Sequence, residues 1–387
     1  MTILGMKEDR AERGSMGGSP GRRAPARVAL VISSLGPGGA ERVVCALARH
    51  WIGEGCEVTV VTVASPELDV YQLPAGARRM ALGLARPSRN VVEGGVQATR
   101  RVLALRRALV QVAPEVVVSF LESTNVLSLL ATPGLGMPVV VCERTDPRVV
   151  RIGVPWAALR RVLYPRAAAV VVQTRGVAGW ARAFCRRVEV IENFVECSAQ
   201  HAEPGISRGP KLLIAMGRLS AGKGFDLLID AFGRIAGSRP DWSLTILGEG
   251  PERARLEAQS AALRLEGRVA LPGRVREPTP WLLAAHAFAL SSRHEGYPNA
   301  LLEAMAAGLP AVAFDCPSGP SDIIEDGRNG LLVPAGDVAQ FAVALGRLAD
   351  HPEERARIGL NARDIAVTHA PARILGRWSE LLKGVVT

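Results

Sequence analysis

The amino-acid sequence predicts an α/β protein built from two Rossmann-like domains. The chain has 387 residues, which is too long for one ordinary hydrophobic core, and 48% of them are hydrophobic. Short apolar runs typical of buried strands alternate with helix-forming stretches, and this layout occurs twice. A polar segment at residues 196–210 separates the two halves. We therefore expect two parallel sheets, facing each other across a cleft.

Strand-like segments recur along each half, with helical patterns between them. Those of the first half lie at residues 27–32, 57–62, 115–119, 139–142, 168–173 and 188–191. Those of the second half lie at residues 211–216, 243–247, 269–272, 287–290, 311–314 and 330–333. Ligands of open parallel sheets bind beyond the carboxyl ends of the strands, so functional residues are expected in the loops that follow these segments.

The domain boundaries follow from this pattern. Residues 1–26 are polar and rich in Gly, Ser and Arg, and are predicted to be disordered. Residues 27–200 are predicted to form the first domain and residues 201–370 the second. A last helical pattern in residues 371–387 follows the second sheet.

No membrane span or secretory signal is expected. The longest uncharged run, residues 123–142, has the length of a span, but prolines and glycines interrupt it. It is better interpreted as a helix, a turn and a buried strand. The polar N-terminus does not resemble a signal peptide, and the six cysteines show no metal-binding spacing. They are typical of small core residues in a reducing cytoplasm.

The positive charge lies in the first half of the chain. Residues 1–200 hold 26 Lys and Arg against 16 Asp and Glu, whereas residues 201–387 hold 21 of each. This excess favours an anionic partner such as a membrane surface, a lipid-linked phosphate or nucleic acid. The alternative is a compositional bias, since nearly all these cations are arginines. No recognised nucleic-acid-binding motif is present, so we expect no nucleic-acid partner.

Two basic, amphipathic stretches could contact an anionic membrane, at residues 97–112 and 155–165. In the second, Arg160 and Arg161 accompany Trp156 and Tyr164. We expect this stretch to bring the protein to the inner face of the cytoplasmic membrane. The alternative is an ordinary amphipathic helix that packs on a sheet.

Residues 295–334 are the most informative part of the sequence. Glu295 and Glu303 flank a turn and a predicted helix at residues 299–307, with Asn299 as the expected N-cap. The free amides of the first helical turn suit a phosphate. Glu303 would lean back toward the same end, where its carboxylate could accept hydrogen bonds from a ribose diol. The alternative is that Glu303 only complements the helix dipole.

This region resembles the signature of family 4 glycosyltransferases, whose E-x7-E motif corresponds to Glu295 and Glu303. The segment at residues 321–337 is similar to the family as well, and the resemblance covers nearly the whole chain from Arg27. It implies the GT-B fold, with a C-terminal helix that crosses back to the first domain. It also implies transfer of a sugar from a nucleotide-diphosphate sugar, which we expect to be UDP-linked, with retention of the anomeric configuration.

The resemblance extends to the loop after the first strand of the second half. There Arg218 and Lys223 match the family's diphosphate-binding pair, although alone they could be solvated surface cations. Arg218, Lys223 and Glu295 are the expected catalytic residues. The expected donor-binding residues are Gly38, Gly39, Gly217, Arg274, Val275, Gly296, Tyr297, Asn299, Ala300, Leu301 and Glu303.

Polar residues after two strands of the first half predict the acceptor site. They are Ser123, Thr124, Asn125, Glu143, Arg144 and Asp146. Several of them could instead be helix caps. The segments around them resemble a bacterial subgroup that transfers N-acetylgalactosamine and related sugars to polyprenyl-diphosphate glycans. The histidine that some family members carry near here is absent from residues 119–122.

No metal or other cofactor is expected. The sequence contains no D-x-D triplet of the kind that holds a divalent ion on the diphosphate, so Arg218, Lys223 and a helix N-terminus would supply the positive charge. Two other functions remain open at this point. One is a nucleotide-sugar hydrolase or epimerase on the same fold, and the other is a basic nucleic-acid-binding protein.

Overall fold

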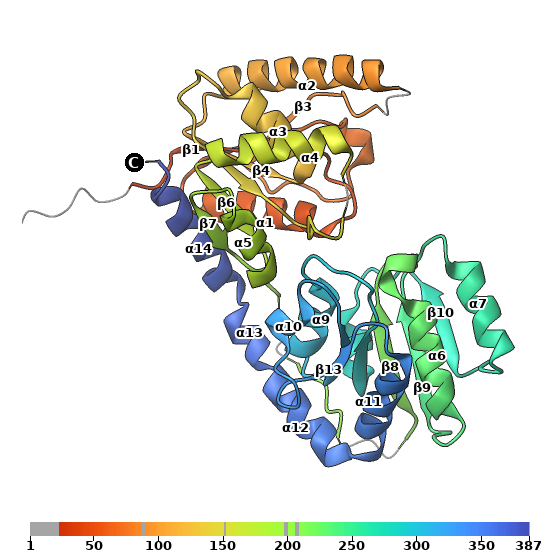
Figure 1. Ribbon diagram of the computed structural model, residues 1–387. Coiled ribbons are helices and arrows are strands. Elements are labelled where there is room, and N and C mark those ends of the chain that lie inside the picture. The colour runs from red at the N-terminus through yellow and green to blue at the C-terminus, as the bar shows by residue number, and fades with distance from the viewer. Residues whose placement is uncertain (1–22, 87–89, 151, 197–199, 206–208, 387) are drawn as a thin grey trace, which may run out of the picture.

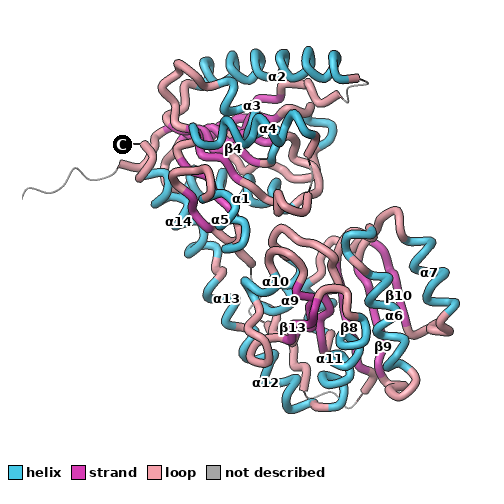
Figure 2. Tube along the Cα trace, viewed as in Figure 1, coloured by secondary structure: helices cyan, strands magenta, loops and turns pink. Residues whose placement is uncertain are grey.

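The computed structural model describes residues 23–86, 90–150, 152–196, 200–205 and 209–386 (Figure 1). Residues 1–26 were predicted to be disordered, and residues 1–22 of that segment lie outside the described residues. The model contains two separate parallel sheets, each flanked by helices, which confirms the predicted fold class (Figure 2).

The first sheet has the strand order β3-β2-β1-β4-β5-β6-β7. Its strands are β1 Arg27–Ile32, β2 Glu57–Thr62, β3 Arg78–Ala81, β4 Val116–Phe120, β5 Val139–Cys142, β6 Ala169–Val172 and β7 Val188–Val190. The helices of this half are α1 Gly39–Gly53, α2 Val91–Val112, α3 Glu122–Ala131, α4 Val154–Leu163 and α5 Arg175–Arg182, with short 3-10 turns η1 Pro66–Leu68 and η2 Tyr164–Arg166.

The second sheet has the strand order β10-β9-β8-β11-β12-β13. Its strands are β8 Lys211–Met216, β9 Trp242–Leu247, β10 Val269–Gly273, β11 Ala287–Leu290, β12 Ala311–Asp315 and β13 Leu331–Pro334. The helices that follow in this half are η3 Ala221–Lys223, α6 Phe225–Ala236, α7 Arg253–Ala262, α8 Thr279–Ala284, α9 Asn299–Ala306, α10 Pro320–Ile323, α11 Val338–Asp350, α12 Pro352–Ala362, α13 Asp364–Thr368 and α14 Pro371–Lys383.

Each sheet is covered on both faces by apolar clusters. In the first half, one face packs against α1 and the other against α2, α3, α4 and α5. Helix α14, the last of the chain, also packs on the first sheet rather than the second (Figure 1). Trp378 of α14 is buried against Phe120, and Ser379 Oγ accepts a hydrogen bond from Trp51 Nε1 at 3.1 Å. The C-terminal helix therefore ties the two halves together.

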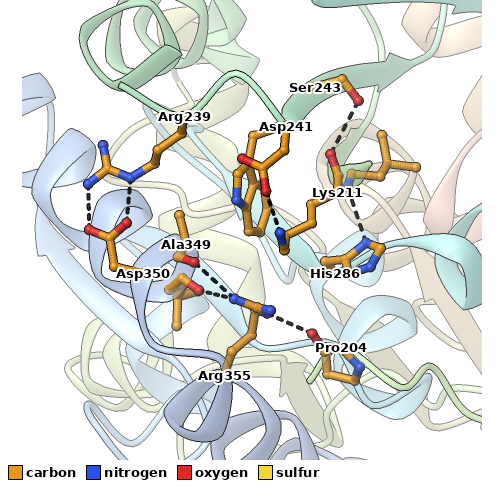
Figure 3. Close-up of polar contacts among 12 residues, drawn as sticks. Pro204, Lys211, Arg239, Asp241, Ser243, His286, Ala349, Asp350 and Arg355 are labelled. Carbon is orange, nitrogen blue, oxygen red and sulfur yellow. Dashed lines mark hydrogen bonds and ion pairs between the residues drawn. The ribbon is translucent and has the colours of Figure 1, made fainter. Parts of the chain in front are cut away.

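A buried arginine holds several segments of the second half together, on the side of the sheet opposite the strands' carboxyl ends. Arg355 of α12 donates from Nε to the carbonyl of Pro204 at 2.7 Å and from Nη1 to the carbonyls of Leu348 and Ala349 (Figure 3). Its guanidinium also lies over the Trp242 ring. Nearby, Arg239 and Asp350 pair at 2.6 Å. These contacts hold the segment that enters the second half, on the side opposite the strands' carboxyl ends.

Residues 123–142 form most of α3 and all of β5, as predicted. Over the described residues, none of the helices combines the length and apolarity needed to cross a bilayer. Five cysteines, Cys45, Cys56, Cys142, Cys185 and Cys316, are buried free thiols, and Cys197 lies outside the described residues.

Candidate active site between the two domains

Two adjoining cavities lie between the halves, both lined by residues that follow the carboxyl ends of strands. The Arg218 cavity has a volume of about 800 Å³ and the Lys223 cavity about 400 Å³. Gly217 and Ala300 line both, so the two cavities are adjacent. The loop after β1 contributes Pro37 to the first cavity and Gly38 and Gly39 to the second.

Most of the residues predicted to bind the donor or carry catalysis meet here. The Arg218 cavity is lined by Gly217, Arg218, Arg274, Val275, Ala300 and Glu303. The Lys223 cavity is lined by Gly38, Gly39, Arg144, Gly217, Lys223, Glu295, Gly296, Tyr297, Asn299 and Ala300. The exception among the donor-binding candidates is Leu301, which is fully buried in the apolar cluster beneath α9.

Lys223 and Glu295 form an ion pair at the carboxyl edge of the second sheet. Lys223 Nζ lies 2.6 Å from Glu295 Oε1, which also accepts a 2.6 Å hydrogen bond from Ser292. The turn that presents Lys223 needs Gly224, whose φ is +62°. A Cβ there would approach the carbonyl oxygen of Ser291 to 2.0 Å, so only glycine allows this close passage of the two loops.

Glu303 is held from the opposite half. Arg42, in the first turns of α1, places Nη1 at 2.6 Å from Glu303 Oε1, and its guanidinium lies over the Phe194 ring. Both charged groups keep partial contact with solvent. The sequence prediction missed Arg42 because nothing local indicates that a residue at the start of α1 meets a glutamate of the second domain.

The N-cap of helix α9 lies one residue earlier than predicted. The N-cap is Pro298, and Asn299 is the first helical residue, so the prediction of Asn299 as N-cap is wrong. Pro298 has an extended backbone, and no side chain caps this helix. The Asn299 side chain instead crosses to the first half, where its Oδ1 accepts a 2.6 Å hydrogen bond from Asn193 Nδ2.

Close approach between the two halves also explains two glycines. A Cβ on Gly296 would lie 2.3 Å from the carbonyl oxygen of Arg144, and one on Gly39 would lie 2.9 Å from Asn299 Nδ2. Both positions therefore keep the halves in contact at the rim of the Lys223 cavity.

Three of the predicted acceptor residues are interior and line neither cavity. Thr124, Asn125 and Glu143 are buried between the first sheet and its helices, which does not fit acceptor binding. Glu143 accepts a 2.5 Å hydrogen bond from the Tyr164 hydroxyl and lies 3.5 Å from Arg160. Burial raises the pKa of this carboxyl to about 7.

The other acceptor candidates differ in position. Ser123 is exposed and lines neither cavity. Asp146 is buried and accepts hydrogen bonds from Arg148 and, across the domain boundary, from Ser318 Oγ at 2.5 Å. The hydrogen bond between Asp146 and Ser318 joins the two halves. Only Arg144 of this group faces the Lys223 cavity.

The predicted membrane stretch is wrong for two of its residues. Arg160 and Tyr164 are buried, and they face Glu143 rather than solvent. Arg161 is exposed, and so are the apolar residues Val154 and Val162 on the outer face of α4. Helix α4 is therefore an ordinary amphipathic helix. Its exposed face carries Arg161, Val154 and Val162, whereas Arg160 and Tyr164 were expected there.

Over the described residues, no cluster of three or more His, Cys, Asp or Glu side chains could hold a metal ion. The two cavities instead present arginine, lysine and a helix N-terminus. Two Rossmann-like domains whose strand ends face a common cleft are the arrangement found in the GT-B class of transferases.

Two glycosyltransferase family models match the chain. The family model for Glycosyltransferase Family 4 matches residues 37–199, and the model for glycosyl transferases group 1 matches residues 198–365. The chain belongs to this family of glycosyltransferases.

The chain is similar to two bacterial enzymes and to one protein of known structure. The chain is 30% identical over 288 residues to the exopolysaccharide phosphotransferase SCO2592 of Streptomyces coelicolor, covering 73% of this chain but 30% of that protein. It is 25% identical over 360 residues to a Campylobacter jejuni alpha-1,4-N-acetyl-D-galactosaminyltransferase acting on a PP-undecaprenol-linked glycan, covering 93% of this chain and 99% of that one. Anabaena Alr3699/HepE, solved with UDP, matches with a TM-score of 0.74 at 18% identity, over 92% of this chain and all of that one.

Proposed function

We propose that this protein transfers a sugar from a nucleotide-diphosphate sugar to a glycan or lipid-linked glycan in bacterial cell-surface polysaccharide synthesis. The observation that carries the proposal is the convergence of Arg218, Lys223, Glu295 and Glu303 on two adjacent cavities at the strand ends. The Campylobacter relative, similar along its whole length, acts on a PP-undecaprenol glycan, and the Anabaena neighbour binds UDP. We extend both to this chain, with UDP as donor nucleotide and N-acetylgalactosamine or a related hexose as the transferred sugar.

The residues suggest a division of labour within the cleft. Glu303 would accept hydrogen bonds from the ribose in the Arg218 cavity, and Arg218 with Lys223 would neutralise the leaving diphosphate. Glu295 would position the transferred sugar, with its own carboxylate oriented by Lys223 and Ser292. The acceptor hydroxyl would attack the same face of the sugar that the diphosphate leaves, and a departing phosphate oxygen would take its proton. This route retains the anomeric configuration without a protein nucleophile.

The deciding experiment combines binding with turnover. A panel of nucleotide sugars is tested for the one that raises the melting temperature most, since a ligand that binds only the folded state stabilises it. That sugar is then incubated with the protein, with and without a polyprenyl-diphosphate glycan. Transfer to the glycan with an unchanged anomeric configuration supports the proposal. Equal donor consumption without any glycan would identify a hydrolase or epimerase instead.

We propose that transfer needs no divalent metal, because the cleft supplies its own positive charge. The expected result is that activity of the purified protein survives EDTA in large excess over protein, because fixed cations of the protein rather than a metal ion stabilise the leaving diphosphate. Initial rates with and without EDTA are the measurement. Loss of activity with EDTA that magnesium or manganese restores would contradict this proposal.

We also propose that the protein works at the inner face of the cytoplasmic membrane, where a lipid-linked acceptor would be reached. The outer face of α4 carries Arg161 with the exposed Val154 and Val162, and α2 and α3 continue the same layer (Figure 1). Such a combination of arginine and apolar side chains suits a bilayer surface.

Charge reversal on this face tests the membrane contact. Arg161→Glu is expected to reduce sedimentation with anionic liposomes severalfold and leave neutral liposomes unaffected, because each basic residue near an anionic surface contributes about 1 kcal/mol. Arg234→Glu, an exposed position in the second half, makes the same change in net charge and is the control. Equal loss of binding in both variants would show that only overall charge matters.

A further inference from the structure

His369 lies where the chain crosses from the second half back to the first. It follows α13 directly and precedes α14, which packs on the first sheet (Figure 1). The other crossing, which follows β7, passes beside it, because Val195 N donates a 3.0 Å hydrogen bond to the His369 carbonyl. The two connections between the halves therefore meet at this residue.

The His369 side chain binds the loop that carries Glu295. The Tyr297 hydroxyl lies 2.7 Å from His369 Nε2, and the two rings are stacked with their centroids 6.1 Å apart. Tyr297 is buried, and over the described residues its hydroxyl has no other hydrogen-bond partner. Glu295 and Tyr297 both line the Lys223 cavity, whereas His369 lines neither that cavity nor the Arg218 cavity. The position of this loop thus depends on a residue outside the site.

Neighbouring hydrogen bonds determine which His369 nitrogen carries the proton. The Thr368 hydroxyl donates to the Asp364 carbonyl at 3.0 Å, and the same hydroxyl oxygen lies 2.9 Å from His369 Nδ1. Because the hydroxyl proton is already used, Nδ1–H must donate to Thr368, and Nε2 must accept from Tyr297. The hydrogen bond to Tyr297 therefore requires the neutral imidazole.

Charged groups of the neighbouring elements face this imidazole. Glu192 follows β7, and Arg373 and Arg377 lie on α14. Burial lowers the pKa of His369; Glu192 opposes this effect, and the two arginines add to it. Burial also raises the pKa of Tyr297, so its hydroxyl keeps the proton that it donates. Both shifts favour the neutral pair at neutral pH.

We propose that His369 is a positioning residue, which holds the Glu295 loop in place through the Tyr297 hydroxyl. This rests on the proposed function, in which Glu295 positions the transferred sugar. Arg218 and Glu303, the proposed contacts of the donor nucleotide, lie outside this loop. Loss of the hydrogen bond between Tyr297 and His369 should therefore affect turnover of the sugar and leave the binding of UDP unchanged.

The test compares Tyr297→Phe, His369→Phe and His369→Gln with wild type. Phenylalanine at position 369 keeps a ring against Tyr297 but cannot accept a hydrogen bond, whereas glutamine offers an amide oxygen near the place of Nε2. Both phenylalanine variants should lower kcat by about three- to tenfold, as expected for loss of one neutral hydrogen bond, with an unchanged affinity for UDP in calorimetry. His369→Gln should restore most of that rate. His351→Phe changes an exposed histidine before α12 and is the matched control.

The pH profile of kcat separates positioning from packing. Protonated His369 cannot accept from Tyr297, so the hydrogen bond is present above the pKa of His369 and is lost below it. Wild type should therefore lose turnover on the acid side of the ordinary histidine range, because burial lowers that pKa. This acid limb should be missing from Tyr297→Phe, whose loop no longer responds to His369. It should also be missing from His369→Gln, which keeps an acceptor but does not titrate.

Lower kcat in both phenylalanine variants, recovery with glutamine and loss of the acid limb support the positioning role. Turnover of Tyr297→Phe equal to that of wild type, or an acid limb that persists in Tyr297→Phe and His369→Gln, overturns it. Equal loss of kcat in His369→Gln and His369→Phe, with lower melting temperatures and weaker UDP binding, would assign His369 to packing alone. If wild type does not bind UDP or transfer a sugar, the proposed function fails, and with it the role assigned to His369.

Discussion

Replacing Lys223 with alanine is expected to lower kcat by about 100- to 1,000-fold, with a much smaller effect on donor affinity. The leaving diphosphate gains negative charge as the glycosidic bond breaks, so a fixed cation beside it stabilises the transition state more than the ground state. Arg218→Ala should act in the same direction. Single-turnover rates at saturating donor measure the effect directly. Arg234→Ala, an exposed arginine outside both cavities, is the control.

One structural consequence of the Lys223 variant must be separated from catalysis. Lys223 pairs with Glu295, whose side chain is only 7% exposed, so the variant leaves a nearly buried carboxylate with Ser292 as its remaining partner. The double variant Lys223→Ala/Glu295→Gln removes that unpaired charge. We expect it to be at least as slow as Lys223→Ala, because Glu295 is proposed to position the sugar. Recovery of turnover in the double variant, or a single variant within a fewfold of wild type, would show that Lys223 serves only as a structural partner.

The sheets could be predicted from sequence because buried parallel strands are nearly continuous apolar runs. All twelve expected strands occur, with shifts of one residue at several ends. β3 was missed, since Arg78–Ala81 has the sequence RRMA and pairs only at the edge of the sheet, where a strand need not be apolar.

The loops of the second half that line the cavities could be predicted because their residues lie close together in sequence and match a family motif. Contacts across the cleft could not be predicted in this way. Arg42 and Glu303 are separated by 261 positions, and either alone is an ordinary charged residue near the start of a helix. The same holds for Asn193, which joins Arg144 of its own half to Asn299 of the other.

Most of the acceptor candidates lie outside the two cavities, and the sequence could not predict this for a different reason. A polar residue just after a strand can face the cleft or lie between the sheet and its covering helices, and sequence does not distinguish the two. Asn125 takes the second position, where its amide donates to the Cys142 carbonyl and the Tyr164 hydroxyl. Its neighbour Glu143 joins the same interior network, whereas Arg144, one residue further, reaches the cavity. Alternation along the chain after β5 explains this difference.

Glu303→Gln is expected to weaken donor binding by about 10- to 100-fold, with little change in kcat once donor is saturating. Arg42 occupies Glu303 Oε1, and in the described residues Oε2 has no protein partner, so a ribose diol can use the free oxygen. Glutamine keeps the size of the side chain and a carbonyl that Arg42 can still reach. The change therefore removes the charge without opening the fold.

Two further measurements decide whether the ribose is what Glu303 recognises. Calorimetry with UDP and with 2′-deoxyuridine diphosphate should show a smaller loss for the deoxynucleotide, because one of the two hydroxyl partners is already missing. Arg42→Met tests the alternative that Glu303 merely holds the domains together through its ion pair. In that case Arg42→Met alone would weaken UDP binding as much as Glu303→Gln, and the double variant would add nothing. If Glu303 binds ribose, Glu303→Gln should weaken UDP binding in the Arg42→Met background as well, and an unchanged UDP affinity there would remove the assignment.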